Sequence, residues 1–423
     1  FSYRVREVLR NEGLHLLEHL KPQTPDQVRE AVQWAAKNKA PVELIGHGSK
    51  RVIGRPGNAG HTLDVSALSG ISLYEPAELV LSAGAGTALS EIEEAVAAND
   101  QQLAFEPPDL SHLLGHGNGK GTLGGNIASN FSGPRRIKAG AARDHFLGFK
   151  AVSGRGENYK SGGRVVKNVT GYDLCKLLAG SWGTLGVMTE LTIKVLPKPE
   201  KIRTVLVMGL DAGAGVAAMT RAFHSPHDVT GGAWLPEVLA AGSKASYVRE
   251  AKASMTAIRV EGPGPSVEYR CRALREELGI FGPTEELHGH NSSWFWSEVR
   301  DVLPFAVDGD TRLVWRISVP PQAGAGLAAY LTDDPGSQAF LDWGGGLIWL
   351  AVPQTDFAHA NTIRAAVSEV GGHATLVRAP EELRVAVPVF EPQSNGLARL
   401  SARVKEGFDP FGILNPGRMY AGV

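Results

Sequence analysis

Glycine is distributed unevenly along this chain. It accounts for 51 of the 423 residues. Three stretches combine it with Ser, Thr or Asn just before or after a strand-like segment: GHGS (46–49), GTLGGN (121–126) and GSWGTLG (180–186). Because glycine lacks a Cβ atom, successive peptide N–H groups in such turns can point toward one anion, for example a diphosphate. Tight turns alone would explain any single stretch, whereas three together favour a large phosphate-bearing cofactor.

Two common nucleotide-binding patterns do not fit the spacing. In the segment that begins SAGAGTAL (82–89), Gly84 and Gly86 are followed by Leu89, where the dinucleotide fingerprint G-x-G-x-x-G requires a third glycine. No Gly-Lys-Ser/Thr sequence with P-loop spacing occurs, although GHGSK (46–50) has a superficial likeness to one. The spacing therefore argues against a Rossmann site and against kinase or NTPase function.

Composition and charge exclude several other classes. With 43% apolar and 21% charged residues and a net charge of -1, the chain has the composition of a folded soluble protein and no basic field for nucleic acid or an anionic membrane. Cys175 and Cys271 are its only cysteines, which argues against a disulfide framework, a zinc site or an iron–sulfur cluster. The apolar runs are shorter than the ~20 residues of a membrane span. We therefore expect no metal site, no transmembrane segment and a reducing, cytoplasmic location.

Periodicity predicts an α+β protein with two domains. A helix is expected from Thr24 to about Lys39, since Thr24 and Gln27 have capping-box spacing and Pro25 follows the cap. Strands are expected at 41–45, within 79–87 and within 187–195, and a β-hairpin at 147–163; helices are expected around Leu89 and Leu174. After the prolines near residue 200, strands alternate with alanine-rich helices at 213–223 and 359–370. We place a domain boundary near residue 200.

Six segments together carry a family resemblance: PVELIGHGSK, EPPD, GTLGGNIASNFSG, RRIKAGAARDHFLG, VKNVTGYDLCKLLAGSWGTLGV and FDPFGILNPGR. In this order they resemble the FAD-linked oxidases of the vanillyl-alcohol oxidase type, and within that family the FAD-binding subunits of bacterial glycolate oxidases. The resemblance covers about residues 22–200 and the last fifteen residues. It implies a two-lobed PCMH-type FAD-binding domain at 1–200 (lobes about 22–105 and 106–200). It also implies an α+β cap or substrate domain at 201–380. A C-terminal segment at 381–423 would then return to the FAD domain.

The resemblance also implies where FAD binds. The loop Ile45 to Ser49 would hold the diphosphate, Pro108 would begin a second wall, and Asn415 would lie near the flavin. The cofactor-binding residues so implied are Ile45, Gly46, His47, Gly48, Ser49, Pro108, Asp109, Thr122, Gly124, Gly125, Asn126, Ser129, Gly133, Gly183, Gly186, Val187 and Asn415. Members with covalent FAD carry a histidine where this chain has Ser49, so we expect dissociable FAD.

No catalytic residue is assigned from the sequence. Oxidation of a 2-hydroxy acid needs a hydride acceptor, a base and a cation for the carboxylate. Related dehydrogenases carry an HxGDGN pattern, which neither HGHN (288–291) nor GGHATLVRAP (371–380) reproduces. His373 and Arg378 could be a base and a carboxylate anchor, but a packed or solvated histidine is the simpler interpretation.

Three arginines next to the second glycine stretch allow two interpretations. Arg135, Arg136 and Arg143 could bind a phosphate or a substrate carboxylate, because guanidinium groups recognise both in bidentate fashion. Surface or interdomain salt bridges explain them equally well.

The resemblance implies a FAD-binding subunit of a glycolate oxidase complex, which takes part in oxidising glycolate to glyoxylate by electron transfer through flavin. Its partners would be a larger FAD-containing oxidase subunit and an iron–sulfur subunit, and any contact with the inner membrane would be made through them. The alternative is a self-sufficient FAD-dependent dehydrogenase of another hydroxy acid or alcohol, with its base in the cap. A scaffold without cofactor is disfavoured by its many entropically costly glycines.

Overall fold

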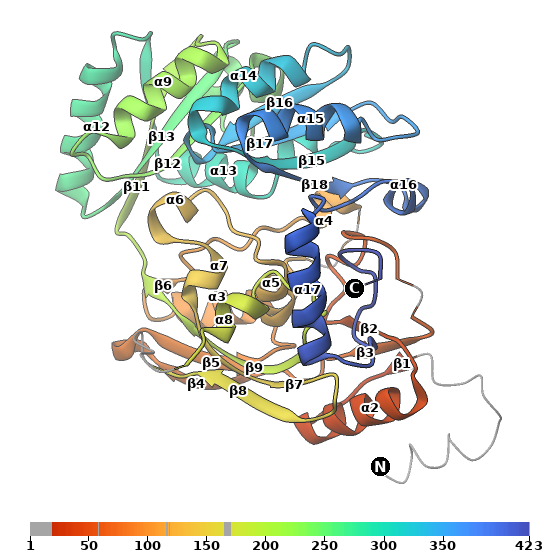
Figure 1. The fold of residues 1–423 in the computed structure, drawn as a ribbon. Coiled ribbons are helices and arrows are strands. Elements are labelled where there is room, and N and C mark those ends of the chain that lie inside the picture. The colour runs from red at the N-terminus through yellow and green to blue at the C-terminus, as the bar shows by residue number, and fades with distance from the viewer. Residues whose placement is uncertain (1–18, 58, 116, 118, 165–170, 423) are drawn as a thin grey trace.

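The computed structural model describes all residues except 1–18, 58, 116, 118, 165–170 and 423. Figure 1 shows two bodies stacked on each other. We call residues 19–200 the N-terminal body, residues 201–378 the cap body, and the contact between them the seam. Both bodies mix helices with strands, which confirms the α+β prediction. Residues 1–18 and 165–170 of the predicted FAD domain lie outside the described residues.

The N-terminal body contains two main sheets. The smaller one is parallel, in the order β1 (His19–Leu20), β3 (His61–Asp64) and β2 (Val42–Ile45). The larger one is antiparallel, in the order β4 (Ile71–Glu75), β5 (Val80–Gly84), β9 (Val187–Lys194), β7 (Phe146–Val152) and β8 (Asn158–Gly162). β6 (Gln101–Gln102) pairs with β10 (Leu196–Pro197). The larger sheet takes strands from both sides of residue 105, so it spans the predicted lobe boundary, and the lobe limits stay predictions.

Local sequence explains the first helix, α2 (Pro25–Asn38). Thr24 caps it, as predicted, with Oγ1 accepting a hydrogen bond from the Gln27 nitrogen at 3.2 Å. Val28 and Val32 are buried on one face of the helix. The hairpin β7–β8 also confirms its prediction. The other helices of this body are short: η1 (Pro76–Glu78), α3 (Leu89–Ala97), α4 (Ser111–Leu114), α5 (Leu123–Ser129), α6 (Arg136–Ala139), α7 (Ala142–His145) and α8 (Leu174–Leu178).

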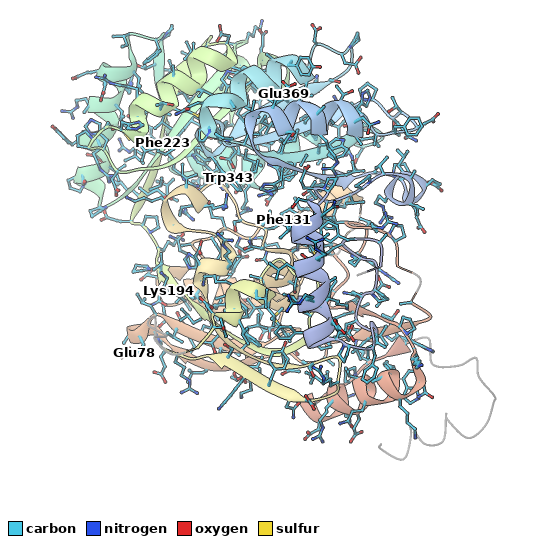
Figure 2. The ribbon with its side chains drawn as sticks, viewed as in Figure 1. Glu78, Phe131, Lys194, Phe223, Trp343 and Glu369 are labelled. Atoms are coloured by element: carbon cyan, nitrogen blue, oxygen red, sulfur yellow. The ribbon has the colours of Figure 1, made fainter. Side chains whose placement is uncertain are left out.

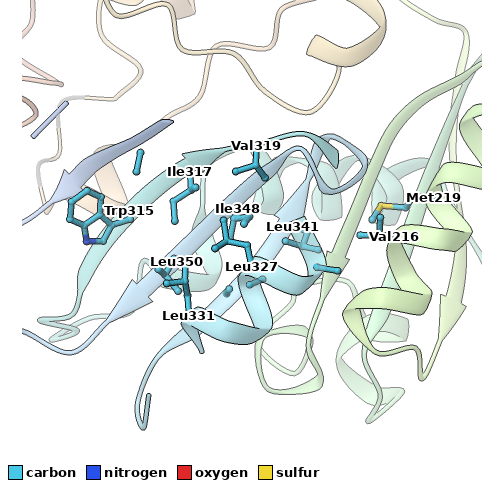
Figure 3. Packing of buried hydrophobic residues seen from close by; sticks show 14 of the residues in the cluster. Val216, Met219, Trp315, Ile317, Val319, Leu327, Leu331, Leu341, Ile348 and Leu350 are labelled. Atoms are coloured by element: carbon cyan, nitrogen blue, oxygen red, sulfur yellow. The ribbon is translucent and has the colours of Figure 1, made fainter. Parts of the chain in front are cut away.

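The cap body is built on one eight-stranded antiparallel sheet. Its order is β14 (Thr284–His288), β11 (Lys201–Met208), β13 (Met255–Gly262), β12 (Val229–Leu235), β16 (Gln338–Asp342), β17 (Leu347–Val352), β15 (Leu313–Ser318) and β18 (His373–Arg378). On the outer face lie α9 (Ala212–Phe223), α12 (Gly264–Leu278), α14 (Pro321–Leu331) and α15 (Ala360–Val370). Figure 3 shows part of the apolar core between this face and its helices, with Trp315, Leu327 and Ile348 fully or almost fully buried.

The inner face of the cap sheet meets the N-terminal body. The helices α10 (Glu237–Ala240), α11 (Ser246–Glu250) and α13 (Gly289–Arg300) and the short turns η2 (Leu303–Phe305) and η3 (Trp343–Gly345) belong to this side. Its apolar core includes Trp349 and Phe340 of the cap and Phe131 of the N-terminal body. Figure 2 places Phe131 and Trp343 on the two sides of the seam. One continuous core therefore holds the two bodies together.

After the cap sheet the chain returns to the N-terminal body. α16 (Glu381–Ala386) is followed by α17 (Asn395–Phe408), which runs back along the N-terminal body in Figure 1. Lys405 of this helix is buried, and its Nζ donates to Asp409 at 2.7 Å and to the Thr184 carbonyl at 2.8 Å. Leu414 then forms a parallel bridge with Val42 of β2. The boundary that we predict near residue 380 stays a prediction, but the return itself is observed.

Candidate functional site

The first two glycine stretches lie against each other. A Cβ atom on Gly46 would lie 2.5 Å from Oγ1 of Thr122, and one on Gly121 would overlap Oγ of Ser49. Glycine is therefore needed at both places because two turns of the chain cross there. The third stretch joins them through Gly183, whose added Cβ would lie 2.8 Å from the Asn415 amide nitrogen.

The three stretches and the C-terminal return line one cleft. Of the seventeen cofactor-binding residues that the resemblance implies, eleven line it: Ile45, Gly46, His47, Gly48, Ser49, Thr122, Gly124, Gly125, Gly183, Gly186 and Asn415. The structure thus brings the main part of the predicted set together, from segments that lie up to 371 residues apart.

The loop after β2 offers donors to an anion. Among the described residues, no acceptor is present for the backbone N–H groups of Gly48, Ser49 and Lys50. Gly48 has φ of +73°, and nothing lies within 4 Å of the place where its Cβ would be. Three successive unpaired N–H groups beside an open, left-handed glycine form the concave arrangement that binds phosphate oxygens.

The charges of the lining also favour an anion. The lining contains three cationic side chains, Lys50, Arg51 and Arg418, and one carboxylate, Glu43, which accepts a hydrogen bond from Nε of Arg51 at 2.9 Å. Nζ of Lys50 donates to the Lys120 carbonyl at 3.0 Å, and burial lowers the pKa of this amine to about 8 against a smaller opposing effect of Asp109. Burial likewise lowers the pKa of Arg418 to about 10, although Glu43 favours its charge. Burial removes water from both cations, and the negative charge of a bound diphosphate would compensate for this loss.

Some predicted residues hold the cleft together through their side chains. Oδ1 of Asn415 accepts from the Leu44 nitrogen and its Nδ2 donates to the Trp182 carbonyl, both at 2.7 Å. Thr122 caps α5, with Oγ1 accepting from the Gly125 nitrogen at 3.2 Å. Ser129 Oγ donates back to the Gly125 carbonyl at 2.9 Å. These side chains shape the site and do not point free groups into it.

Six predicted residues do not line the cleft: Pro108, Asp109, Asn126, Ser129, Gly133 and Val187. The backbone nitrogen of Asp109 donates to Asp301 of the cap at 2.8 Å. A Cβ on Gly133 would lie 2.8 Å from Glu106 and 2.9 Å from Arg300, so this glycine permits close packing at the seam. Pro108 is buried, and Val187 is a buried residue at the start of β9. Their roles toward FAD stay predictions.

Asn126 is fully buried in α5, and neither polar atom of its side chain has a hydrogen-bond partner among the described residues. Among the described residues such an unpaired buried amide costs about 1–3 kcal/mol. Because Asn126 does not line the cleft, its role toward FAD stays a prediction.

Sequence reasoning missed several lining residues, among them Glu43, Lys50, Arg51, Trp182 and Arg418. Lys50 directly follows GHGS, and Arg418 ends the segment NPGR, so both lie within the quoted segments. Nη2 of Arg418 donates to the Lys50 carbonyl at 3.0 Å across 368 residues. Only the fold reveals this contact, since no local pattern links the two positions.

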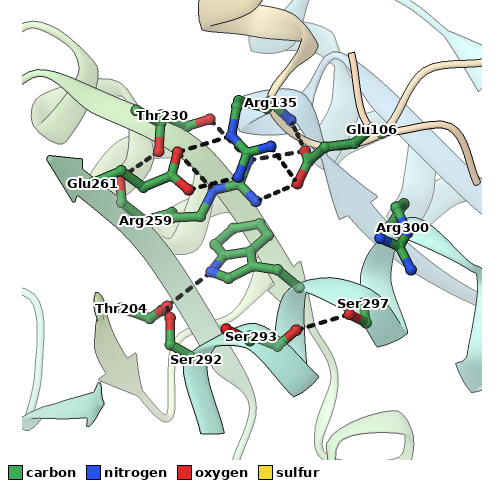
Figure 4. A network of polar contacts seen from close by, with 12 residues as sticks. Glu106, Arg135, Thr204, Thr230, Arg259, Glu261, Ser292, Ser293, Ser297 and Arg300 are labelled. Atoms are coloured by element: carbon green, nitrogen blue, oxygen red, sulfur yellow. Dashed lines mark hydrogen bonds and ion pairs between the residues drawn. The ribbon is translucent and has the colours of Figure 1, made fainter. Parts of the chain in front are cut away.

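The three candidate arginines have different surroundings. Arg135 belongs to a buried network at the seam, drawn in Figure 4, in which its Nη2 lies 2.7 Å from Glu261 and its Nη1 3.1 Å from Glu106. Arg143 is half exposed and lies 3.7 Å from Asp144. Arg136 forms no ion pair within the described part of the chain. The salt-bridge interpretation therefore holds for Arg135, which cannot also bind a ligand.

The pairing of His373 with Arg378 as base and anchor does not fit the structure. Arg378 lies 3.0 Å from Asp310, and its Nε donates to the Arg312 carbonyl at 2.9 Å. With its guanidinium committed in this way, Arg378 is not available for a substrate. His373 lies at the start of β18, opposite Ser318.

The described ranges contain neither a membrane-spanning helix nor a metal-binding cluster. No helix there is long and apolar enough to cross a bilayer. No group of three or more His, Cys, Asp or Glu side chains there is arranged to hold a metal ion.

The cleft therefore fits an extended dinucleotide such as FAD, and comparisons with known proteins agree. Residues 19–162 match the family model of the FAD binding domain. The chain is 36% identical to the glycolate oxidase subunit GlcE of Escherichia coli (strain K12), over 93% of this chain and 96% of that protein. It is 25% identical to the glycolate oxidase subunit GlcD of Bacillus subtilis (strain 168), over 95% and 88% of the two chains.

A solved structure shows the same fold. That of p-cresol methylhydroxylase with substrate bound has a TM-score of 0.69 and 15% identity, and the match covers 95% of this chain and 88% of the other. The fold, the FAD binding domain and the extended similarity to GlcE lead to one conclusion. The chain belongs to the family of FAD-linked oxidoreductases that contains the glycolate oxidase subunit GlcE.

Proposed function

We propose that the chain is the FAD-binding subunit of a glycolate oxidase complex and takes part in the oxidation of glycolate to glyoxylate. The observation that carries this proposal is a cationic cleft with unpaired N–H donors, built by a chain similar to GlcE over almost its whole length. FAD, when bound, supplies a flavin ring that accepts hydride from the carbon next to a carboxylate.

The roles of the chain's own residues follow from the cleft. The N–H groups of Gly48, Ser49 and Lys50 would hold the diphosphate, and the charges of Lys50 and Arg418 would neutralise it. Asn415 and Thr122 keep the walls at the right separation through the hydrogen bonds described above. Binding is non-covalent, since Ser49 offers no imidazole. Denaturation in acid should therefore release all flavin into the supernatant.

We propose two partners: a larger FAD-containing oxidase subunit and an iron–sulfur subunit. Similarity to both GlcE and GlcD supports an assembly of more than one chain. We place the chain in the cytoplasm, with any contact with the inner membrane made through these partners.

Co-purification from a native extract tests the assembly. The tagged chain should carry flavin absorbance, retain the two partners and oxidise glycolate only in their presence. Glycolate oxidation by the isolated chain at the rate of the complex would instead support the self-sufficient dehydrogenase, and a colourless chain that refuses added FAD would overturn the proposal.

A further inference from the structure

Two guanidinium groups at the seam form no ion pair with any of the residues that the structure describes. Arg136 begins α6 of the N-terminal body, and Arg316 lies on β15 of the cap. Their Cζ atoms lie 4.2 Å and 5.0 Å from the centre of the Trp343 ring. Within the described part of the chain, neither guanidinium donates a hydrogen bond or lies within 4.0 Å of a carboxylate. Arg135 and Arg259, their neighbours at the seam, are both paired with Glu106.

This arrangement is unfavourable as it stands. Burial, together with the charge of Arg136, lowers the pKa of Arg316 to about 10. Burial followed by the charge of Arg143 lowers the pKa of Arg136 as well. Two desolvated cations beside each other cost free energy unless an anion binds between or beside them.

The sheet register places further polar groups beside Arg316. Arg316 pairs with Thr375 on one side and with Trp349 on the other. Two residues along the strand, Ser318 pairs with His373. Since alternate residues of a strand share a face, Arg316, Ser318, Thr375 and His373 form one polar region on the sheet face that meets the N-terminal body.

One carboxylate, that of Asp342, lies close by but is already engaged. Its Oδ1 accepts a hydrogen bond from the Trp343 nitrogen at 2.7 Å, and burial raises its pKa to about 7. It therefore neutralises Arg316 only in part.

The polar region adjoins the cofactor cleft. Arg316 lies 5.7 Å from the centre of the Phe131 ring, and Phe131 meets Trp182 edge-on at 6.1 Å. Trp182 lines the cleft. A ligand held by the two arginines would therefore lie at the seam side of the cleft.

We propose that Arg136 and Arg316 bind the carboxylate of a small 2-hydroxy or 2-oxo acid at the seam, beside the cofactor cleft. A guanidinium that lies over aromatic rings keeps its N–H donors in its own plane, where they match the two oxygens of a carboxylate. The hydroxyl and imidazole groups of Ser318, Thr375 and His373 suit the second polar group of such an acid. This inference rests on the proposed function for the choice of acid, but not for the existence of the anion site.

Calorimetric titration of the full flavin-loaded chain tests the site, with oxalate and glycolate as probes and inorganic phosphate as comparator. Oxalate and glycolate should bind, and Arg136→Met and Arg316→Met should each weaken binding about tenfold or more, as expected for loss of a charge-assisted pair. Arg316→Lys should restore part of the affinity. Arg143→Met is the matched control, because it removes a nearby, half-exposed cation, and it should change affinity less than about threefold.

Flavin absorbance and thermal melting of each variant separate loss of the site from loss of the fold. Equal affinity of wild type and both methionine variants, or no binding of either acid, would overturn the proposal. Tighter binding of phosphate than of either acid would overturn the choice of a carboxylate. If the arginine-dependent binding is found but the assembled complex does not oxidise glycolate, the site stands and the proposed function fails.

Discussion

The side-chain oxygen of Asn415 accepts a hydrogen bond from the backbone nitrogen of Leu44 at 2.7 Å, across 371 residues of sequence. The amide nitrogen of the same side chain donates to the Trp182 carbonyl, also at 2.7 Å. One residue of the C-terminal return thus ties β2 to the third glycine stretch, and both line the cleft.

Replacing this residue should weaken both the fold and the site. Asn415→Ala leaves the Leu44 N–H and the Trp182 carbonyl unpaired, which should lower the free energy of unfolding by about 1–3 kcal/mol. The affinity for FAD should fall as well, because the walls are no longer tied. Urea denaturation and FAD titration measure the two effects. Asn395→Ala, at an exposed position of α17, should change neither.

Gly48 tests whether the first loop faces the cofactor. Gly48→Ala places a methyl group in open space at φ of +73°, so backbone strain should cost about 1–2 kcal/mol. Gly309→Ala is the matched control, because Gly309 has φ of +78° and equally open surroundings, but lies in an exposed loop of the cap. Both variants should lose similar stability, and only Gly48→Ala should lose FAD affinity. Equal affinity in both would place the diphosphate elsewhere.

Lys50 should make FAD binding depend on pH. Burial lowers the pKa of its amine from 10.5 to about 8, so the cofactor-free cleft loses a positive charge as the pH rises through that range. The dissociation constant of FAD should therefore increase above about pH 8, and Lys50→Met should bind FAD weakly at every pH. Fluorescence titration between neutral and alkaline pH gives both profiles, with the exposed Lys37→Met as control.

The lowered pKa of Lys50 should also make the stability of the FAD-free protein depend on pH. Because the folded state binds fewer protons than the unfolded state between about pH 8 and 10.5, the contribution of Lys50 to the free energy of unfolding rises with pH over that interval. Lys50→Met should abolish this rise. An unchanged slope in the variant would show that other groups cause it.

The buried carboxylate of Glu106 at the seam should make the free energy of unfolding depend on pH in the acidic range. Burial disfavours its charge, but Arg135 and Arg259 outweigh burial and hold its pKa at about 2, below the ordinary 4.5. The stabilisation is present above pH 4.5 and is lost as the pH falls toward 2. Glu106→Gln should lower the free energy of unfolding at neutral pH by about 3–5 kcal/mol, since it leaves two buried guanidiniums without this carboxylate.

Denaturation curves at a series of acidic pH values test this prediction. The free energy of unfolding of the wild type should fall as the pH decreases from 4.5 toward 2. For Glu106→Gln, the free energy of unfolding should change less steeply with pH over the same interval. Glu94→Gln, on the exposed side of α3, should behave as the wild type. A variant as stable as the wild type would mean that the network adds nothing to the seam.

Local patterns were sufficient to predict the elements that position the site. Thr24 and Pro25 determine where α2 begins, the first glycine stretch follows β2, and the third directly precedes β9, as expected. The second stretch adjoins no strand and instead enters α5. Sheet membership was not predictable, because β5 pairs with β9, more than 100 residues later in the chain. The pairing depends on long-range packing, which no window of the sequence contains.

The candidate site was predictable from the sequence only at positions where the backbone conformation or close packing requires glycine. Gly46 and Gly48 stand out because few other residues fit there. Lys50 and Arg418 do not, since a lysine or arginine in a loop is usually solvated, and only the contact between them shows that both line the cleft. Arg136 and Arg316 likewise come together only when the two bodies pack on each other.

The late position of Asn415 and Arg418 in the chain affects how the holoprotein is made. During translation the ribosome completes the glycine loops and then the entire cap before it adds these residues, 371 positions after Leu44 in the case of Asn415. A nascent chain therefore exposes an unfinished trough for most of its synthesis. The complete lining becomes available to a cofactor only after the return segment has emerged.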